Sequence, residues 1–467
     1  MYRALLVLAV AGCYHPSLPA GSPCISNDQC PAPLACNAGY CTSGDAGDIV
    51  RDAPPVDAAP DADLACSCQG ETLACPSGNT TCSISCSTTG GPHCTALVPS
   101  NGVSTDLVSG TGTVTITGLT TLDTDTGQIT GVLQRAAGQG LDAGIAYAQQ
   151  TTQGKPIGVF AFHRLSVTAA GIVHFTGSRA AVILVGTDAT VAGTIDLSGG
   201  CYGNEIQCPG PGGGSGALYT ATAGGCGPGG AGTTDAATGA DSGGGGGGAG
   251  SNGAIGGTET ASGDLFKGGT AGQACLASDL EPLVGGSGGG GGGPGNGTAT
   301  YGGGGGGALQ LSALSSITIS GVLDAGGAGG DTGPTDASNG GAPGGGGAGG
   351  AILLEAPQVT ITAAGIVAAN GGGGGGASDH LHAGTAGQNG QASAQPALGG
   401  IAGNNGTGSG GNGGAGSTAA TKGGDATDVN SGAGGGGVGR IFVRSAGGPA
   451  LAGTVSPSAG TALVRSQ

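Results

Sequence analysis

The chain has 467 residues, of which 115 are glycine, and it carries a formal net charge of −17. Glycine supplies about a quarter of the chain against about 7% in ordinary proteins, while only 8% of residues are charged. This composition excludes an ordinary globular core and an extended, highly charged disordered chain. The 11 basic residues are scattered singly, which excludes nucleic-acid binding through a basic stripe and electrostatic attraction to an anionic membrane surface.

Aromatic residues are scarce: there is no Trp, and only 5 Phe and 7 Tyr. A core must therefore be built from Val, Ile, Leu and Ala. Burying a Val- or Leu-sized side chain contributes roughly 1.5–3 kcal/mol to folding. Such side chains favour a thin, stacked core.

Residues 1–12 have the pattern of an export signal, with one basic residue followed by the apolar run Ala4–Ala11, which is too short to span a bilayer. The run ends in Val10-Ala11-Gly12-Cys13, which resembles the lipobox of bacterial lipoproteins. The resemblance implies a lipid on Cys13 and attachment to a membrane through this anchor. Tyr14 follows in place of the Asp that retains many lipoproteins at the inner membrane, so we expect a surface-exposed outer-membrane protein. A plain signal peptide with a chance Cys is the alternative.

The other 14 cysteines fall into three even groups, which in an exported chain indicates disulfide bonds. Zinc is the alternative, but the paired C-x2-C spacing of zinc modules is absent. The sequence does not give the pairing. The candidates are Cys24, Cys30, Cys36 and Cys41; Cys66, Cys68, Cys75, Cys82, Cys86 and Cys94; and Cys201, Cys208, Cys226 and Cys275.

Two cysteine-rich modules, 13–42 and 66–98, flank an Asp/Ala/Pro linker over 43–65. The spacing C-x5-C-x5-C-x4-C, with Gly39-Tyr40-Cys41 at its end, resembles small secreted EGF-like and Dickkopf-like modules. Repelling aspartates and prolines predict an extended linker that holds the following region away from the lipid.

Residues 99–200 predict the start of a β region. Alternating apolar and polar residues predict strands over Thr113–Thr117, Arg164–Thr168 and Ala180–Val191. The segment Leu133–Gln150 is rich enough in Ala and Gln to predict one short helix.

A recurring phrase predicts the architecture of the rest. VTAAGIV at 167–173 returns as ITAAGIV at 361–367, and shorter copies of small-Gly-aliphatic occur elsewhere. Successive marker glycines are separated by 22, 128, 44 and 88 residues, which favours an all-β parallel β-helix with a coil of about 22 residues. The markers are Gly171, Gly193, Gly321, Gly365 and Gly453.

Residues 201–467 form the glycine-rich part of this predicted solenoid. Glycine blocks run directly into the apolar segments Ala308–Leu311, Ala351–Leu354 and Arg440–Val443, which we expect to be strands. The glycine blocks either pack as adjoining polyglycine helices bonded through their backbones or form long mobile loops. The sequence leaves both alternatives open.

Residues 190–445, with Gly-Gly-x tracts and strand interludes, resemble the glycine-rich domains of the PE-PGRS proteins and, more broadly, glycine-rich surface lipoproteins of Gram-negative bacteria. The PE domain is replaced here by the lipobox and cysteine modules, so that family's partners do not carry over.

Several short motifs match those of enzymes, but their flanking residues do not support a catalytic role. Asp125-Thr126-Gly127 and Asp331-Thr332-Gly333 match the aspartic-protease triplet without its flanking residues. Gly285-Gly286-Ser287-Gly288-Gly289 fits G-x-S-x-G only because a glycine tract fits any glycine motif. His380 and His382 lack a third metal ligand, so we expect no catalytic, cofactor or metal residues.

We therefore expect a non-enzymatic, lipid-anchored surface protein with a structural or adhesive role, in contact with a glycan or a surface protein. One alternative is a polysaccharide lyase or hydrolase of the β-helix kind. Another is an inhibitor or receptor module carried by the cysteine clusters, with the solenoid as a spacer.

Overall fold

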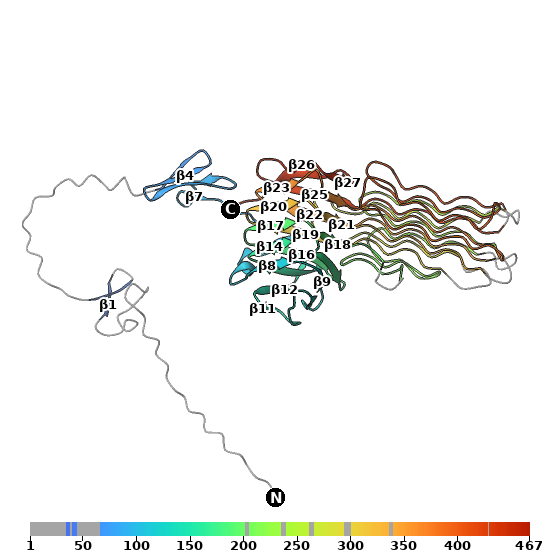
Figure 1. Cartoon of the computed structure of the whole chain (residues 1–467), viewed down its shortest axis with the longest axis horizontal. Coiled ribbons are helices and arrows are strands. Elements are labelled where there is room, and N and C mark those ends of the chain that lie inside the picture. Colours follow the sequence, from blue (N-terminus) through green and yellow to red (C-terminus); the bar gives the residue numbers. More distant parts are fainter. Residues whose placement is uncertain are drawn as a thin grey trace, which may run out of the picture. The chain divides into compact units, whose positions relative to one another are not determined.

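The computed structural model describes residues 34–37, 40–43, 66–200, 205–234, 240–260, 266–293, 300–335, 340–427 and 429–467. The chain divides into two units, Met1–Leu64 and Ala65–Gln467. In the first unit the strands β1 (Leu34–Asn37) and β2 (Tyr40–Ser43) form an antiparallel hairpin in which Cys36 is opposite Cys41 (Figure 1).

The second unit begins with the second cysteine-rich module, which is made of short antiparallel strands. One sheet has the order β3-β4-β5 and the other pairs β6 with β7. Their bounds are β3 (Ser67–Gln69), β4 (Thr72–Cys75), β5 (Gly78–Thr81), β6 (Cys86–Ser87) and β7 (His93–Cys94).

Three larger sheets follow, each with strands taken from distant parts of the chain. Sheet I contains β11 (Gly140–Asp142), β12 (Ile145–Thr152), β13 (Lys155–Phe162), β16 (Ala180–Val185), β19 (Ala308–Ala313), β22 (Ala351–Glu355), β25 (Arg440–Ser445) and β28 (Gly460–Leu463). Sheet II contains β8 (Thr113–Ile116), β14 (Arg164–Val167), β17 (Asp188–Val191), β20 (Ser316–Ile319), β23 (Gln358–Ile361) and β26 (Ala450–Leu451). Sheet III contains β9 (Leu119–Asp123), β10 (Ile129–Gly131), β15 (Ile172–Thr176), β18 (Thr194–Asp196), β21 (Val322–Asp324), β24 (Ile366–Ala368) and β27 (Thr454–Ser456).

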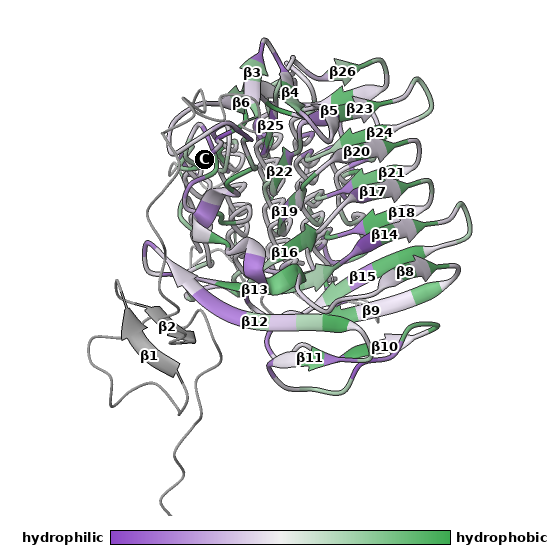
Figure 2. Cartoon of the chain, turned by 90° about the vertical axis from the view of Figure 1, so that its left-hand side faces the viewer, coloured by the Kyte–Doolittle hydropathy of each residue, from purple (hydrophilic) through white to green (hydrophobic). Residues whose placement is uncertain are grey.

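From β13 to β27 the chain visits sheets I, II and III in turn, five times over, and each strand pairs in parallel with the equivalent strand of the next triplet. We call each triplet a rung. Figure 2 shows the strands of sheet II stacked one above another from β8 to β26. The predicted all-β class is confirmed and the pairing is mostly parallel, although no single sheet closes on itself.

The marker glycines stand at equivalent places on neighbouring rungs. The residues that follow them are in register across sheet III: Ile172, Thr194, Val322, Ile366 and Thr454. A coil without an insertion is therefore 22 residues long, as between Gly171 and Gly193, and the wider spacings contain insertions rather than further rungs. A Cβ at Gly193 would lie 2.1 Å from the carbonyl oxygen of Gly171, so the rungs approach too closely for a side chain here.

Ladders of aliphatic side chains form the core. In sheet I, Ile183, Leu311 and Leu354 are in register and at most 1% exposed. In sheet III, Ile195 and Leu323 continue in the same way. One small aliphatic residue per rung on each ladder is enough to fill this thin core, which explains why aromatic residues are scarce.

The predicted helix over Leu133–Gln150 is wrong, because this segment contains β11 and most of β12. β12 pairs with β13 in an antiparallel hairpin that turns at Gln153 and Gly154, both with positive φ. Burial of Ile145 and Tyr147 on the hairpin outweighs the helix propensity of Ala and Gln.

The predicted strands are otherwise present. β8, β14, β19, β22 and β25 lie where alternation or a preceding glycine block placed them. The segment Ala180–Val191 is divided into β16 and β17, because Gly186 and Thr187 turn the chain from sheet I into sheet II.

The glycine-rich residues are three insertions, 197–307, 325–350 and 369–439, each of which leaves sheet III and returns to sheet I. Their described residues form what we call the glycine bundle, whose tracts run side by side away from the sheets (Figure 1). Backbone hydrogen bonds join the tracts to one another, so they are packed and are not loose loops.

Within the bundle the hydrogen-bond partner changes with a period of three residues. The seven amides from Gly344 to Gly350 donate in rotation to three neighbouring tracts. The acceptors, in order, are the carbonyl oxygens of Asp331, Gly290, Gly434, Ala328, Ser287, Gly437 and Ala325. A left-handed extended helix with three residues per turn directs its amides in this way.

The same packing explains why these residues must be glycine. A Cβ at Gly346 would lie 2.1 Å from the carbonyl oxygen of Gly372, and a Cβ at Gly345 would lie 2.1 Å from that of Gly245. Both contacts are with backbone, which can move away only by breaking the hydrogen bonds between tracts.

We expect Gly346→Ala to destabilise the protein by about 1–3 kcal/mol, the usual range for overpacking a close-packed interior. Gly447→Ala is the matched control, because a Cβ at Gly447 meets nothing within 4 Å. Denaturant unfolding followed by circular dichroism checks both variants. Equal midpoints for Gly346→Ala and the wild type would show that the bundle does not need glycine at this position.

Candidate functional site

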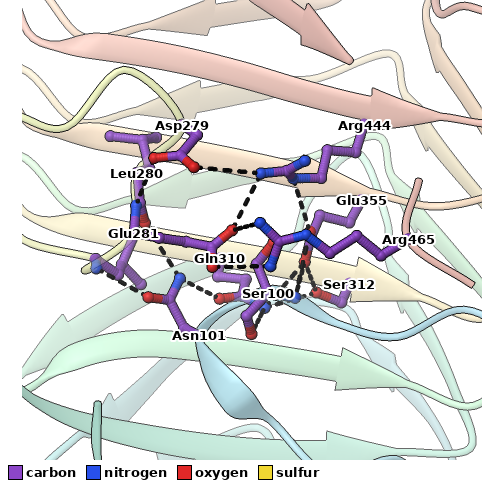
Figure 3. Close-up of polar contacts among 11 residues, drawn as sticks. Ser100, Asn101, Asp279, Leu280, Glu281, Gln310, Ser312, Glu355, Arg444 and Arg465 are labelled. Carbon is purple, nitrogen blue, oxygen red and sulfur yellow. Dashed lines mark hydrogen bonds and ion pairs between the residues drawn. The ribbon is translucent and has the colours of Figure 1, made fainter. Parts of the chain in front are cut away.

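A buried polar cluster lies on the outer face of sheet I, where the first insertion and the segment just before β8 cover it (Figure 3). Sheet I contributes side chains from β19, β22 and β25, and the 3-10 turn η2 (Ser100–Gly102) and the segment Asp279–Glu281 lie over them. The sheet residues are Gln310, Ser312, Glu355 and Arg444.

Glu355 is the centre of this cluster and is fully buried. Its carboxylate accepts hydrogen bonds from the backbone and hydroxyl of Ser100, from Gln310 Nε2 at 3.0 Å and from Ser312 Oγ at 2.9 Å. Arg444 Nε lies 3.4 Å from it. Burial raises the pKa of Glu355, and the bonds from Ser100 and Ser312 and the charge of Arg444 act against that rise.

A second carboxylate, Glu281, joins the two arginines. Arg444 NH2 lies 3.0 Å and Arg465 NH2 2.7 Å from Glu281 Oε1. The hydrogen bond to Glu281 raises the pKa of Arg465. Both carboxylates thus accept hydrogen bonds from within the protein. The cluster fastens three segments to sheet I: Ser100–Gly102, the first insertion through Glu281, and the C-terminal segment through Arg465.

Two further carboxylates lie in register on sheet III, Asp196 on β18 and Asp324 on β21. His174 on β15 precedes them in the same row, with Nδ1 3.3 Å from Asp196 Oδ2. Burial, and then the neighbouring charge of Asp196, raise the pKa of Asp324 to about 7, against one hydrogen bond from the Gly326 amide.

The clearest candidate for contact with a partner is the turn after the tract that leaves β24. Asp379 is 5% exposed and accepts hydrogen bonds from the amides of Leu381 and His382 and from the His382 ring. It is also bonded to Asn404 Nδ2 on the adjacent turn. Burial would raise the pKa of Asp379, but the bonds from His382 and Leu381 lower it to about 2.

This ionised, buried Asp379 fixes a turn whose other side chains point into solvent. Leu381 is 71% exposed, and His380 and His382 are exposed beside it. The structure thus places His380 and His382, which the sequence paired as possible metal ligands, on an exposed turn. No local sequence pattern indicates the role of Asp379, because its partner Asn404 is 25 residues away.

An open hollow of about 470 Å³ lies beside β10 and is lined by polar residues such as Gln128, Gln134 and Asp142. Arg135 also borders it, but its guanidinium donates to the carbonyl oxygens of Gly127, Ala136, Gly140 and Ile145. With its donors used in this way, the arginine is a structural brace and offers little to an anionic ligand.

Disulfide bonds are present among the candidate cysteines. The bonds are Cys66–Cys75, Cys68–Cys86, Cys82–Cys94 and Cys226–Cys275, and Cys208 is also disulfide-bonded. The zinc alternative is therefore wrong for the second module. Cys36 and Cys41 lie in β1 and β2, while Cys13, Cys24, Cys30 and Cys201 lie outside the described residues.

The sequence motifs that match enzymes are not assembled into a site. Asp125 bonds to Ser178, whereas Asp331 lies in the glycine bundle and accepts from the amide of Thr332. Ser287 is fully buried and its hydroxyl accepts from the amide of Gly227, so it has no access to a substrate.

Among the described residues, no three His, Cys, Asp or Glu side chains gather where they could hold a metal ion. A search of the same residues finds no helix with the length and apolar character needed to cross a membrane. Comparison of the chain with protein-family models, with curated proteins and with solved structures finds no match.

We expect Asp324→Asn to change how stability depends on pH. A carboxyl whose pKa is raised in the folded state stabilises the protein below its unfolded pKa near 3.8, and this contribution is lost as pH rises towards 7. Across this window the wild type should lose roughly 2–4 kcal/mol more unfolding free energy than the variant, because the other buried carboxyls, such as Glu355, titrate in both proteins.

Denaturant unfolding from pH 4 to 8 measures this difference, with Asp106→Asn as the control because Asp106 is exposed. Parallel pH profiles for the wild type and Asp324→Asn would contradict the assignment.

Proposed function

We propose that the protein is a non-enzymatic, surface-displayed protein with an adhesive role, and that its glycine bundle presents contact residues to a glycan or surface protein. The observation that carries this proposal is the turn fixed by Asp379, which exposes Leu381 at the end of a glycine tract. A leucine held on a rigid turn loses little conformational freedom when a partner covers it, which favours binding.

The bundle serves in this proposal as a stiff spacer. The tract from Ala369 to Ser378 leaves sheet III and reaches the turn after ten residues, which at ~3.1 Å per residue is about 30 Å. The eight amides from Gly371 to Ser378 all donate to backbone carbonyls of other tracts. Bending the tract would break several of these bonds together, so the turn is held at a fixed distance.

We infer further that the three sheets are the faces of one parallel β-helix and that the tracts are polyglycine II helices. The order I, II, III in every rung supports the first inference. The three-residue period of hydrogen-bond partners supports the second.

We also propose that a lipid on Cys13 anchors the protein in the outer membrane, with the linker 43–65 as an extended stalk. The resemblance of Val10-Ala11-Gly12-Cys13 to a lipobox supports this. The disulfide bonds of the second module are consistent with export, because such bonds persist in oxidising compartments.

Metabolic labelling with a tagged fatty acid tests the anchor. Wild-type protein should be labelled, and Cys13→Ser should lose the label because the acceptor thiol is gone. Cys208→Ser is the control for loss of a cysteine. Label retained on Cys13→Ser would rule out this anchor.

Adhesion of cells that produce the full chain tests the proposed contact turn. We expect His380→Ser/Leu381→Ser to reduce binding to a glycan array or to other bacterial cells at least several-fold, because the exposed contact surface is lost. Leu463→Ser is the matched control, since Leu463 is 69% exposed but lies on β28. Equal adhesion of the wild type and the turn variant would overturn the proposal.

A further inference from the structure

The third insertion contains a tract, 397–404, whose backbone is bonded differently from the interior of the bundle. Leu398 and Ile401 on this tract are 55% and 70% exposed. Among the six consecutive amides from Leu398 to Gly403, only those of Gly400 and Gly403 reach backbone carbonyls, at 2.8 and 2.9 Å. In the interior tract from Gly344 to Gly350 every amide does so.

Side chains accept the other four hydrogen bonds. On one side, Leu398 N donates to Gln388 Oε1 at 3.2 Å and Ile401 N to Thr385 Oγ1 at 2.8 Å. Thr385 and Gln388 are three residues apart, as are the two amides they receive.

The other side of the tract repeats this arrangement. Gly399 N donates to Asn412 Oδ1 at 2.9 Å, and Ala402 N donates to Ser409 Oγ at 3.3 Å. Ser409 and Asn412 are again three residues apart, so both pairs match the turn of the tract they cover.

An outer tract of such a bundle faces the same problem as the edge strand of a β-sheet. Its unpaired amides are a template for the backbone of another molecule, and natural sheets protect such edges with specific side chains. The carbonyl oxygens of Gly399 and Ala402, also three residues apart, accept no hydrogen bond from the described residues, so the same edge of a second copy offers acceptors at the matching spacing.

We propose that Thr385, Gln388, Ser409 and Asn412 close the edge of the glycine bundle and prevent copies of this chain from joining edge to edge. The four side chains take the amides of tract 397–404 that would otherwise bond to a second copy. This role does not depend on whether the turn fixed by Asp379 contacts a partner.

Thr385→Val/Gln388→Met tests the proposal, because it keeps the approximate size of both side chains and removes both acceptors. In sedimentation velocity of the full chain, the wild type should remain monomeric and the variant should at least double its weight-average mass. Gln395→Met/Thr418→Val is the matched control, since it adds the same apolar groups at exposed positions outside the row.

Proline substitutions distinguish association through exposed backbone amides from non-specific hydrophobic association. Leu398→Pro/Ile401→Pro, added to the first variant, removes the two donors, and the φ of proline suits an extended three-residue helix. The combined variant should return to a monomer. The proposal is overturned if the first variant, with a native circular-dichroism spectrum, stays monomeric, or if association persists after the two prolines are added.

Discussion

The hydrogen bond from the amide of one glycine tract to the carbonyl of another is the interaction on which the rest of this structure depends. Such bonds form only if backbones approach until a Cβ would overlap a carbonyl oxygen, as at Gly345 and Gly346. Each insertion begins at sheet III and returns to sheet I, so the tracts of different insertions align because the rungs are in register. The sheets therefore determine where the tracts lie, and glycine determines how closely their backbones can pack.

The two parts of the second unit are stabilised by different forces. Between the sheets, aliphatic ladders such as Ile195 and Leu323 exclude water. The bundle has few side chains to bury and relies on satisfied backbone groups and close contact. At the join, Arg444 on β25 contacts both the buried Glu355 of sheet I and the partly buried Glu281 of the first insertion, which holds the insertion against the sheet. Removing one partner from such a cluster leaves a buried charge without its counterpart, which is costly.

The sequence predicted the features that repeat locally. The strands before and after the glycine blocks, and the marker glycines from Gly171 to Gly453, follow from short patterns that the structure keeps in register. The helix over Leu133–Gln150 was wrong because packing in a hairpin outweighed local propensity. The register of Asp196 with Asp324 follows from the same markers, because each aspartate lies three residues after Gly193 or Gly321. The turn of Asp379 could not be foreseen, because Asn404 reaches it along a folded path that the sequence does not state.

Glycine runs are uninterrupted where a tract lies deep inside the bundle and are interrupted by other residues where it lies at the edge. In runs such as Gly344–Gly347 and Gly371–Gly376, which bond to backbone in every direction, a side chain would meet a neighbouring carbonyl whichever way it pointed. Where a tract lies at the edge, one or two of its three directions are open, and residues such as Thr385 and Leu398 are tolerated there. Side chains outside the glycine runs are therefore concentrated on the outer tracts and the turns. A bundle of this kind can change what it presents to its surroundings without any change to its interior.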